Sequence, residues 1–134
     1  RLLNDRLALH FSAQWNSARK MNASFPGDAT KGKQLIYVPE WSGSALLGAS
    51  IFEALSVSAT LRVLGERYYT ESNDASLPAH AIVDMAIVDG FDLLGYDAEA
   101  KLELRNLLDS SYDIIAFYPM PGRHARVTLT ISTP

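Results

Sequence analysis

The sequence predicts an α+β fold, in which a long N-terminal amphipathic helix precedes a mostly antiparallel sheet of about four or five strands with one or two further helices. In residues 55–63 apolar and polar side chains alternate, as on a strand with one face on a core and the other in water. Residues 125–131 alternate in the same way, after an apolar segment, 113–118, and a Pro-Gly turn. Residues 2–22 instead repeat apolar side chains every three or four positions, which is typical of a helix.

Length and composition favour a single folded domain. The chain has 134 residues, of which 48% are hydrophobic and 20% charged, as in ordinary globular proteins. We therefore expect one domain over residues 1–134, with a helix in 1–22 and a sheet-containing body in 34–134. The absence of cysteine excludes disulfides, a thiolate nucleophile and a cysteine zinc site.

The sequence gives no sign of a helix that crosses a membrane. No apolar segment approaches the roughly 20 residues that such a helix needs, and no signal peptide is visible. We therefore expect no membrane span in this chain. Because the chain begins with Arg1 rather than Met, we also expect that an upstream segment was removed, and a lost membrane anchor is one explanation. No compartment follows from the sequence.

Charge is distributed unevenly along the chain. Residues 1–38 contain six Lys or Arg and two Asp, whereas residues 39–134 contain six basic and thirteen acidic residues. The acidic bulk argues against a nucleic-acid partner. A solvated surface of mixed charge is one explanation, and association of a basic N-terminal arm with an acidic face, residues 71–113, on another copy is the other.

The predicted first helix suggests a protein partner. Its apolar stripe has steps of four and three residues, whereas Leu2 and Leu9 lie off that stripe, so a second surface is expected to cover them. Tyr68 and Tyr69 are aromatic residues near a predicted turn, where exposed rings would mark an interface. The predicted interface consists of Leu2, Arg6, Leu9, Arg19, Lys20, Tyr68 and Tyr69.

The remaining elements follow in chain order from local signals. The predicted strands are residues 34–38, 55–63, 81–88, 113–118 and 125–131. The predicted helices are residues 44–54 and 97–108, and a strand over 101–105 is the alternative to the second helix. Residues 81–88 are apolar on both faces apart from Asp84, which is typical of a central strand.

Candidate catalytic residues are few. Asp84 interrupts an apolar strand, so we expect it to be paired, at a sheet edge, or functional. An acid–base or cation site is the functional alternative, and it would use Asp84, Asp89, Asp92 and His80. The three histidines lack the spacing of metal ligands, and Ser17-Ala-Arg-Lys20 matches a Ser-x-x-Lys pair without its companion motifs. We therefore predict no cofactor and no metal site.

These observations favour a non-catalytic structural or assembly subunit that self-associates or docks in a larger complex. Residues 1–38 of one copy would pack on residues 71–113 of the next, head to tail. A long first helix before an antiparallel sheet is similar, in architecture alone, to pilin and virion-assembly subunits. The alternatives are a small enzyme or metal-binding domain around Asp84, and a small-molecule binding module with aromatic walls.

Overall fold

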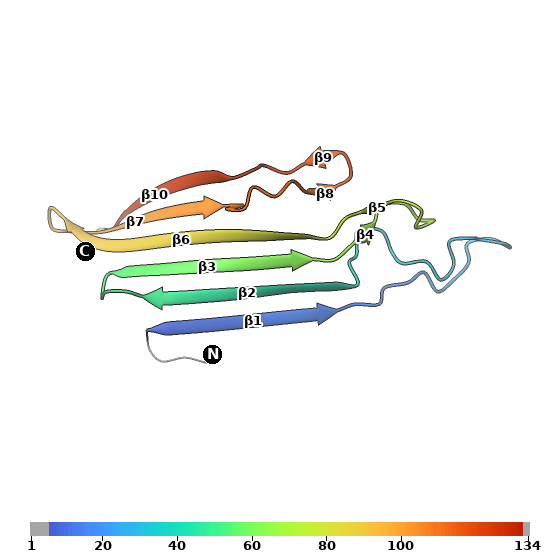
Figure 1. Cartoon of the computed structure of the whole chain (residues 1–134), viewed down its shortest axis with the longest axis horizontal. Helices are drawn as coiled ribbons and strands as arrows, with labels where there is room; N and C mark the ends of the chain where they lie inside the picture. Colours follow the sequence, from blue (N-terminus) through green and yellow to red (C-terminus); the bar gives the residue numbers. More distant parts are fainter. Residues whose placement is uncertain (1–5, 133–134) are drawn as a thin grey trace.

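The computed structural model describes residues 6–132, and these residues form an all-β structure without helices (Figure 1). Six strands form one antiparallel sheet in the order β1-β2-β3-β6-β7-β10, and two small hairpins, β4–β5 and β8–β9, lie outside it. The α+β prediction is therefore wrong. The strands of the sheet are β1 (Leu7–Trp15), β2 (Trp41–Ser50), β3 (Leu55–Leu64), β6 (His80–Leu93), β7 (Tyr96–Arg105) and β10 (His124–Ser132). The small strands are β4 (Arg67–Tyr68), β5 (Ser76–Leu77), β8 (Asp113–Ile115) and β9 (Tyr118–Pro119).

The predicted first helix is wrong because its spacing also fits a strand. Leu7, Phe11 and Trp15 are separated by four residues, and an even separation places side chains on one face of a strand as well. Leu9, which lies off the helical stripe, joins the same strand face. Leu2 lies outside the described residues.

The other two predicted helices are also strands. Residues 44–54 contribute to β2, and residues 97–108 contribute to β7, so the alternative strand over 101–105 is confirmed. In β7, Ala98, Ala100, Leu102 and Leu104 alternate with charged residues, and this period of two overrides the capping signal of Asp97.

The predicted strands are partly confirmed. Residues 55–63, 81–88 and 125–131 lie in β3, β6 and β10. Residues 113–118 are instead divided between β8 and β9, and β10 pairs with β7 rather than with them. Residues 34–38 form no strand, since only Gln34 makes an isolated bridge, to Arg19.

The register of the sheet separates an apolar face from a polar face. Residues paired between neighbouring strands are apolar on one face of the sheet, for example Phe11 with Ala45 and Met85 with Leu104. The apolar face carries the odd-numbered residues of β1, β2, β3, β6 and β10 and the even-numbered residues of β7. Among the described residues of this face only Asp89 is charged. The opposite face carries serines, threonines and the charged residues of the strands.

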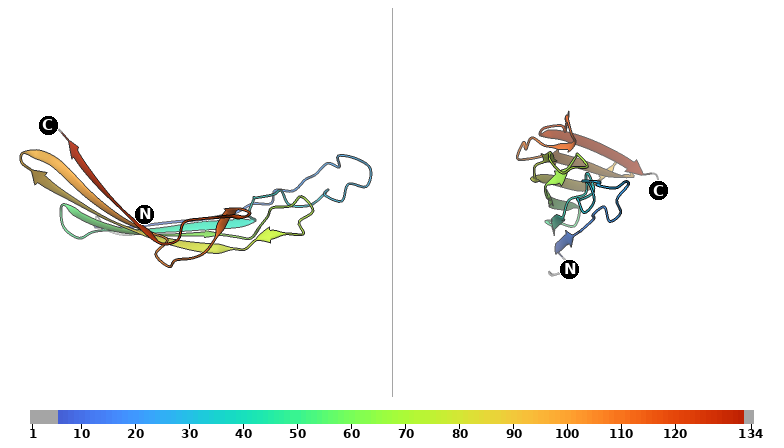
Figure 2. Two further views of the ribbon diagram at one scale, coloured as in Figure 1. Left: turned by 90° about the horizontal axis from the view of Figure 1, so that it is seen from above. Right: turned by 90° about the vertical axis from the view of Figure 1, so that its right-hand side faces the viewer.

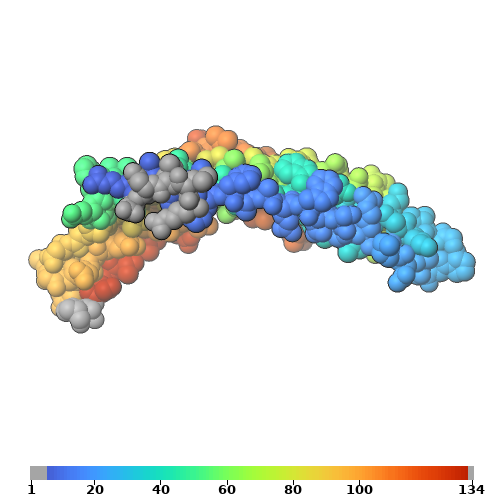
Figure 3. Space-filling view, turned by 90° about the horizontal axis from the view of Figure 1, so that it is seen from below, coloured from blue at the N-terminus to red at the C-terminus, as the bar shows by residue number. Residues whose placement is uncertain are grey.

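The sheet is a single curved layer with no second layer against it (Figures 2 and 3). The solvent-accessible surface of the chain is 9434 Å², whereas a globular protein of this mass exposes about 7,000 Å². The buried apolar residues of the described part are only Leu77, Ile82, Ala98 and Ala116. The edge strands β1 and β10 each have one unpaired side. An apolar sheet face is stable when another surface covers it, and within residues 6–132 no element covers the apolar face of this sheet.

Connections at the two ends of the sheet differ in length. Residues 16–40, 65–79 and 106–123 link strands at one end, whereas residues 51–54 and 94–95 form the short turns at the other (Figure 1).

Within the described residues, no helix is long and apolar enough to cross a bilayer.

Candidate functional site

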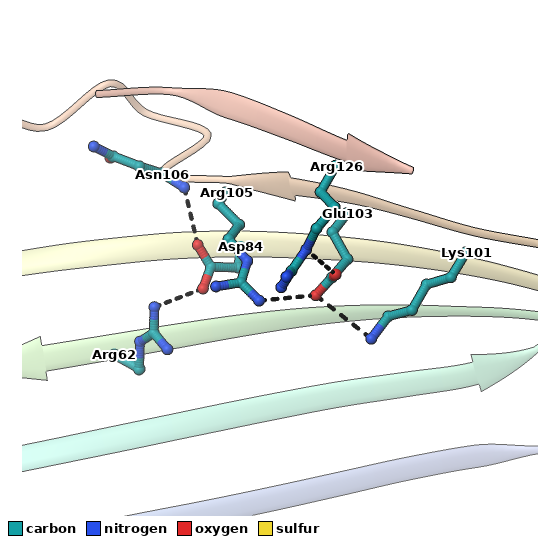
Figure 4. A network of polar contacts seen from close by, with 7 residues as sticks. All are labelled: Arg62, Asp84, Lys101, Glu103, Arg105, Asn106 and Arg126. Atoms are coloured by element: carbon teal, nitrogen blue, oxygen red, sulfur yellow. Dashed lines mark hydrogen bonds and ion pairs between the residues drawn. The ribbon is translucent and has the colours of Figure 1, made fainter. Parts of the chain in front are cut away.

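The polar face carries a network of ion pairs centred on Glu103 (Figure 4). Lys101, Glu103 and Arg105 alternate along β7 and so share a face, and Arg126 lies opposite Glu103 on β10. Glu103 is within 3.4 Å of Lys101 Nζ, 3.1 Å of Arg105 Nη2 and 3.0 Å of Arg126 Nε. The hydrogen bond from Arg105 is the largest cause that lowers the pKa of Glu103, and the three positive charges act in the same direction.

A second ion pair links the sheet to the connection after β7. Arg62 Nη2 on β3 lies 2.6 Å from Asp84 Oδ2, and the backbone N–H of Asn106 donates to Asp84 Oδ1 at 2.9 Å (Figure 4). Asp84 therefore has partners for both oxygens, in agreement with the expectation that it is paired. Whether it also acts in catalysis stays a prediction.

Asn106 anchors the β7–β10 strap, which we define as residues 106–123. Asn106 is 2% exposed and adopts a φ of 50°, in the left-handed region that Asn tolerates. Its side-chain amide donates to the carbonyl of Ser110 at 2.9 Å and to that of Pro121 at 3.4 Å, and its oxygen accepts from the N–H of Ser110 at 2.9 Å. One side chain thus joins the beginning and the end of the strap.

The strap borders an open hollow of about 950 Å³ on the polar face. Arg62 and Arg105 contribute positive charge there, and Asp84 contributes negative charge. Its polar lining on the sheet is Ser12, Gln14, Ser42, Ser44, Arg62, His80, Asp84, Arg105 and His124, and the strap adds Tyr112, Ile114, Met120 and Pro121. Cationic donors beside an aromatic and aliphatic wall suit an anionic ligand with an apolar part.

His80 and Arg67 contact the strap through their side chains. The rings of His80 and Tyr112 stack with centroids 4.7 Å apart, and Arg67 Nη2 donates to the carbonyl oxygen of Asp113. Burial lowers the pKa of His80, and the charge of Arg67 lowers it further. Burial also lowers the pKa of Arg67.

The predicted carboxylate cluster is not assembled. His80 and Asp84 both line the hollow. Asp89 is on the apolar face, and Asp92 accepts a hydrogen bond from the N–H of Gly95 at the β6–β7 turn. Among the described residues, no group of three histidine or carboxylate side chains is placed to hold a metal ion.

The predicted interface residues are spread over the molecule. Leu9 is on the apolar face, and Arg6 accepts a backbone hydrogen bond from Ser50. Arg19 pairs with Glu40 at 2.9 Å and Lys20 with Asp28 at 3.0 Å. Tyr68 lies in β4, and Tyr69 packs edge-on against Phe117. Their role in an interface stays a prediction.

Most residues of the two ion-pair groups were not predicted from the sequence. Arg62, Glu103, Arg105, Asn106 and Arg126 come from three strands and a connection. The signal for Glu103 and Arg105 was present in the alternation of β7, but the helix prediction concealed it. Arg126 becomes a partner of Glu103 only through the β7–β10 register.

Two solved structures share the fold of this chain. The ferric preacinetobactin receptor BauA from Acinetobacter baumannii matches with a TM-score of 0.82 and 11% identity, over 96% of this chain and 20% of that one. The siderophore receptor PiuA from Acinetobacter baumannii matches with a TM-score of 0.75 and 16% identity, over 95% of this chain and 19% of that one. This chain thus spans about one fifth of the length of these structures. No protein-family model and no curated protein matches it.

Proposed function

We propose that this chain is a segment of the wall of a β-barrel that spans a bacterial outer membrane and binds a ferric siderophore complex on its inner side. One observation carries the proposal: a single-layer sheet presents an apolar face across all six strands and leaves both of its edges unpaired. In lipid, backbone groups need partners within the protein, so a spanning sheet must close into a barrel. Further strands would pair with β1 and β10 and close the wall.

Strand length supports the same conclusion. β1 and β10 have nine residues, and β2, β3 and β7 have ten, whereas a membrane-spanning strand needs about 9–11. The apolar positions of β2 run from Trp41 to Ala49, which is about 27 Å along the strand. A strand tilted by about 40° would therefore cover most of an apolar band roughly 25 Å tall.

Aromatic residues lie at both ends of the apolar face. Trp15 and Trp41 are opposite each other in the β1–β2 register, at the end with long connections. Phe91 and Tyr96 lie near the short β6–β7 turn. Outer-membrane barrels have such aromatic girdles at both interfaces, with short turns at one end and long loops at the other.

The polar face would then line the barrel interior, and the hollow beside the strap is the proposed ligand site. The two receptors of similar fold are described as a ferric preacinetobactin receptor and a siderophore receptor, so the ligand proposed for this hollow is a ferric siderophore complex that carries negative charge. Arg62 and Arg105 are donors suited to such a complex.

Membrane placement is tested in the full-length protein that contains this chain, reconstituted in liposomes. Single cysteines at Val57 and Ser58, carrying a fluorophore, probe opposite faces of β3. We expect brominated lipids to quench the label at position 57 strongly and the label at position 58 weakly. Equal quenching, or stronger quenching at position 58, would contradict the proposal.

Ligand binding is tested separately with two probes, a ferric catecholate and a ferric hydroxamate complex. The double variant Arg62→Gln/Arg105→Gln is expected to weaken binding of the preferred probe about tenfold or more, because two charged donors are lost. Lys31→Gln, which is outside the hollow, is the matched control. Unchanged affinity in the double variant would contradict the ligand site and leave the barrel wall standing.

Self-association is the second candidate function. The unpaired edges of β1 and β10 favour pairing of two copies edge to edge. Light scattering of the full-length protein in detergent tests edge-to-edge pairing, because a sheet whose edges are closed within one chain has no strand edge left to pair with a second copy, whereas open edges predict multimers.

A further inference from the structure

Two consecutive residues of the β7–β10 strap rest on two basic side chains. Tyr112 stacks on His80 of β6, and the Asp113 carbonyl accepts from Arg67 of β4. The strap borders the hollow through Tyr112, Ile114, Met120 and Pro121. Movement of this contact would therefore change access to the hollow.

Both basic side chains contain a buried nitrogen without a hydrogen-bond partner, His80 Nδ1 and Arg67 Nη1. Arg67 is 2% exposed, and none of the ion pairs among residues 6–132 includes it. Buried polar groups without partners destabilise the arrangement that buries them. The closed strap therefore has a local instability at the point where it is docked.

Protonation of His80 would add to this instability. An imidazolium would place a second positive charge near Arg67 in a partly buried position. The Tyr112 ring attracts a cation, and a backbone hydrogen bond with Pro78 raises the pKa of His80. Burial and the charge of Arg67 are the larger causes, and they lower this pKa. On β3 the residue opposite His80 is Leu64, which supplies no charge.

We propose that the strap is an acid-released wall of the hollow, docked (closed) while His80 is neutral and released (open) when His80 is protonated. The closed strap binds fewer protons than the open one, so it is favoured above the ordinary pKa of histidine, near 6.5, and loses stability as the pH falls below it. Between pH 7.5 and pH 5.0 the ratio of open to closed strap rises by up to about 30-fold. This proposal does not depend on placement in a membrane.

The test uses the full-length protein in detergent, with spin labels on cysteines at Ser111 in the strap and Thr128 on β10. Pulsed electron paramagnetic resonance measures the distance between the labels at pH 7.5 and pH 5.0. We expect one distance at pH 7.5 and a second, longer population at pH 5.0. An identical distribution at both pH values would overturn the proposal.

Two variants test whether the pH-dependent change in the label distance depends on His80. His80→Phe keeps a ring for stacking on Tyr112 and cannot titrate, so its strap should remain closed at both pH values. His124→Gln, the control at another histidine of the hollow, should respond like the unmodified protein. If His80→Phe does not fold, Tyr112→Leu replaces it and should be open at both pH values. A pH response that persists in His80→Phe, or in Tyr112→Leu where that is used, would overturn the assignment to His80.

Discussion

Arg126 on β10 lies directly opposite Glu103 on β7, and its Nε donates to Glu103 Oε2 at 3.0 Å. This contact ties the edge strand β10 to its only neighbour in the described sheet. Since Arg105 and Lys101 approach the same carboxylate, one acidic group balances three basic groups on the polar face.

Replacement of Glu103 by Gln should lower the thermal midpoint of unfolding at neutral pH, because three cations then repel one another without a counter-charge. The pKa of Glu103 is lowered in the folded protein, so its contribution is present above the unfolded-state pKa, near 4.5, and is lost as the pH falls below that value. Thermal unfolding of Glu103→Gln and the unmodified protein should therefore differ at pH 7 and converge in acid. An equal difference at pH 7 and in acid would contradict this role.

Removal of the Asp84 carboxylate should loosen the strap. Asp84→Ala leaves the buried N–H of Asn106 without an acceptor, so we expect a loss of about 1–3 kcal/mol in unfolding free energy. Asp84→Asn keeps an acceptor and should lose less. Chemical denaturation of the full-length protein measures both, with Asp92→Asn at the β6–β7 turn as the control. The prediction fails if the Ala and Asn variants are equally stable.

Trp41 packs so closely against Gly65 that a side chain at position 65 would clash with it. A Cβ at Gly65 would lie 2.9 Å from Cε2, Nε1 and the carbonyl oxygen of Trp41, so Gly65→Ala should destabilise the protein by about 1–3 kcal/mol. At Gly48 a Cβ would meet nothing within 4 Å. Gly48→Ala, the matched control, should be neutral or stabilising by about 0.5–1 kcal/mol. Trp fluorescence during unfolding reports both variants, and equal midpoints would refute the close contact.

Arginine substitutions distinguish the two faces of β3. Ala59 is on the apolar face and Ser58 on the polar face. If the apolar face contacts lipid, Ala59→Arg should cost about 2–4 kcal/mol of folding free energy near the middle of the bilayer. Ser58→Arg should cost much less. Urea titration of folding into vesicles measures the difference, and equal tolerance at both positions would count against a lipid-facing sheet.

Local patterns predicted three of the six strands correctly. Alternation identified Leu55–Val63 and Ala125–Ile131, and a continuous apolar run interrupted only by Asp84 identified Ala81–Val88. The helix predictions failed for a physical reason. Leu7, Phe11 and Trp15 are four residues apart, and this spacing fits one face of a helix as well as one face of a strand. Residues 6–132 contain no second layer, so amphipathic strands follow one another there without a covering element.

Of the residues that line the hollow, Asp84 and His80 were candidates from the sequence. Asp84 stood out because it interrupts an apolar strand, and it does form an ion pair. The helix prediction concealed the place of Glu103 in the alternation of β7, and Arg126 gave no signal, since its contact with Glu103 depends on the pairing of β7 with β10. Asn106 was also invisible, because its left-handed φ and its bonds to Ser110 and Pro121 are properties of the folded strap.

In the order β1-β2-β3-β6-β7-β10, every long strand pairs with the long strand before or after it along the chain. Such a sheet can grow from its first hairpin by successive addition, and each finished strand becomes the template for the next. Local pairings of this kind also shorten the search for the native state. The same order makes the sheet modular: deletion of β7 and β10 would leave β1, β2, β3 and β6 paired as before, with β6 as the new edge.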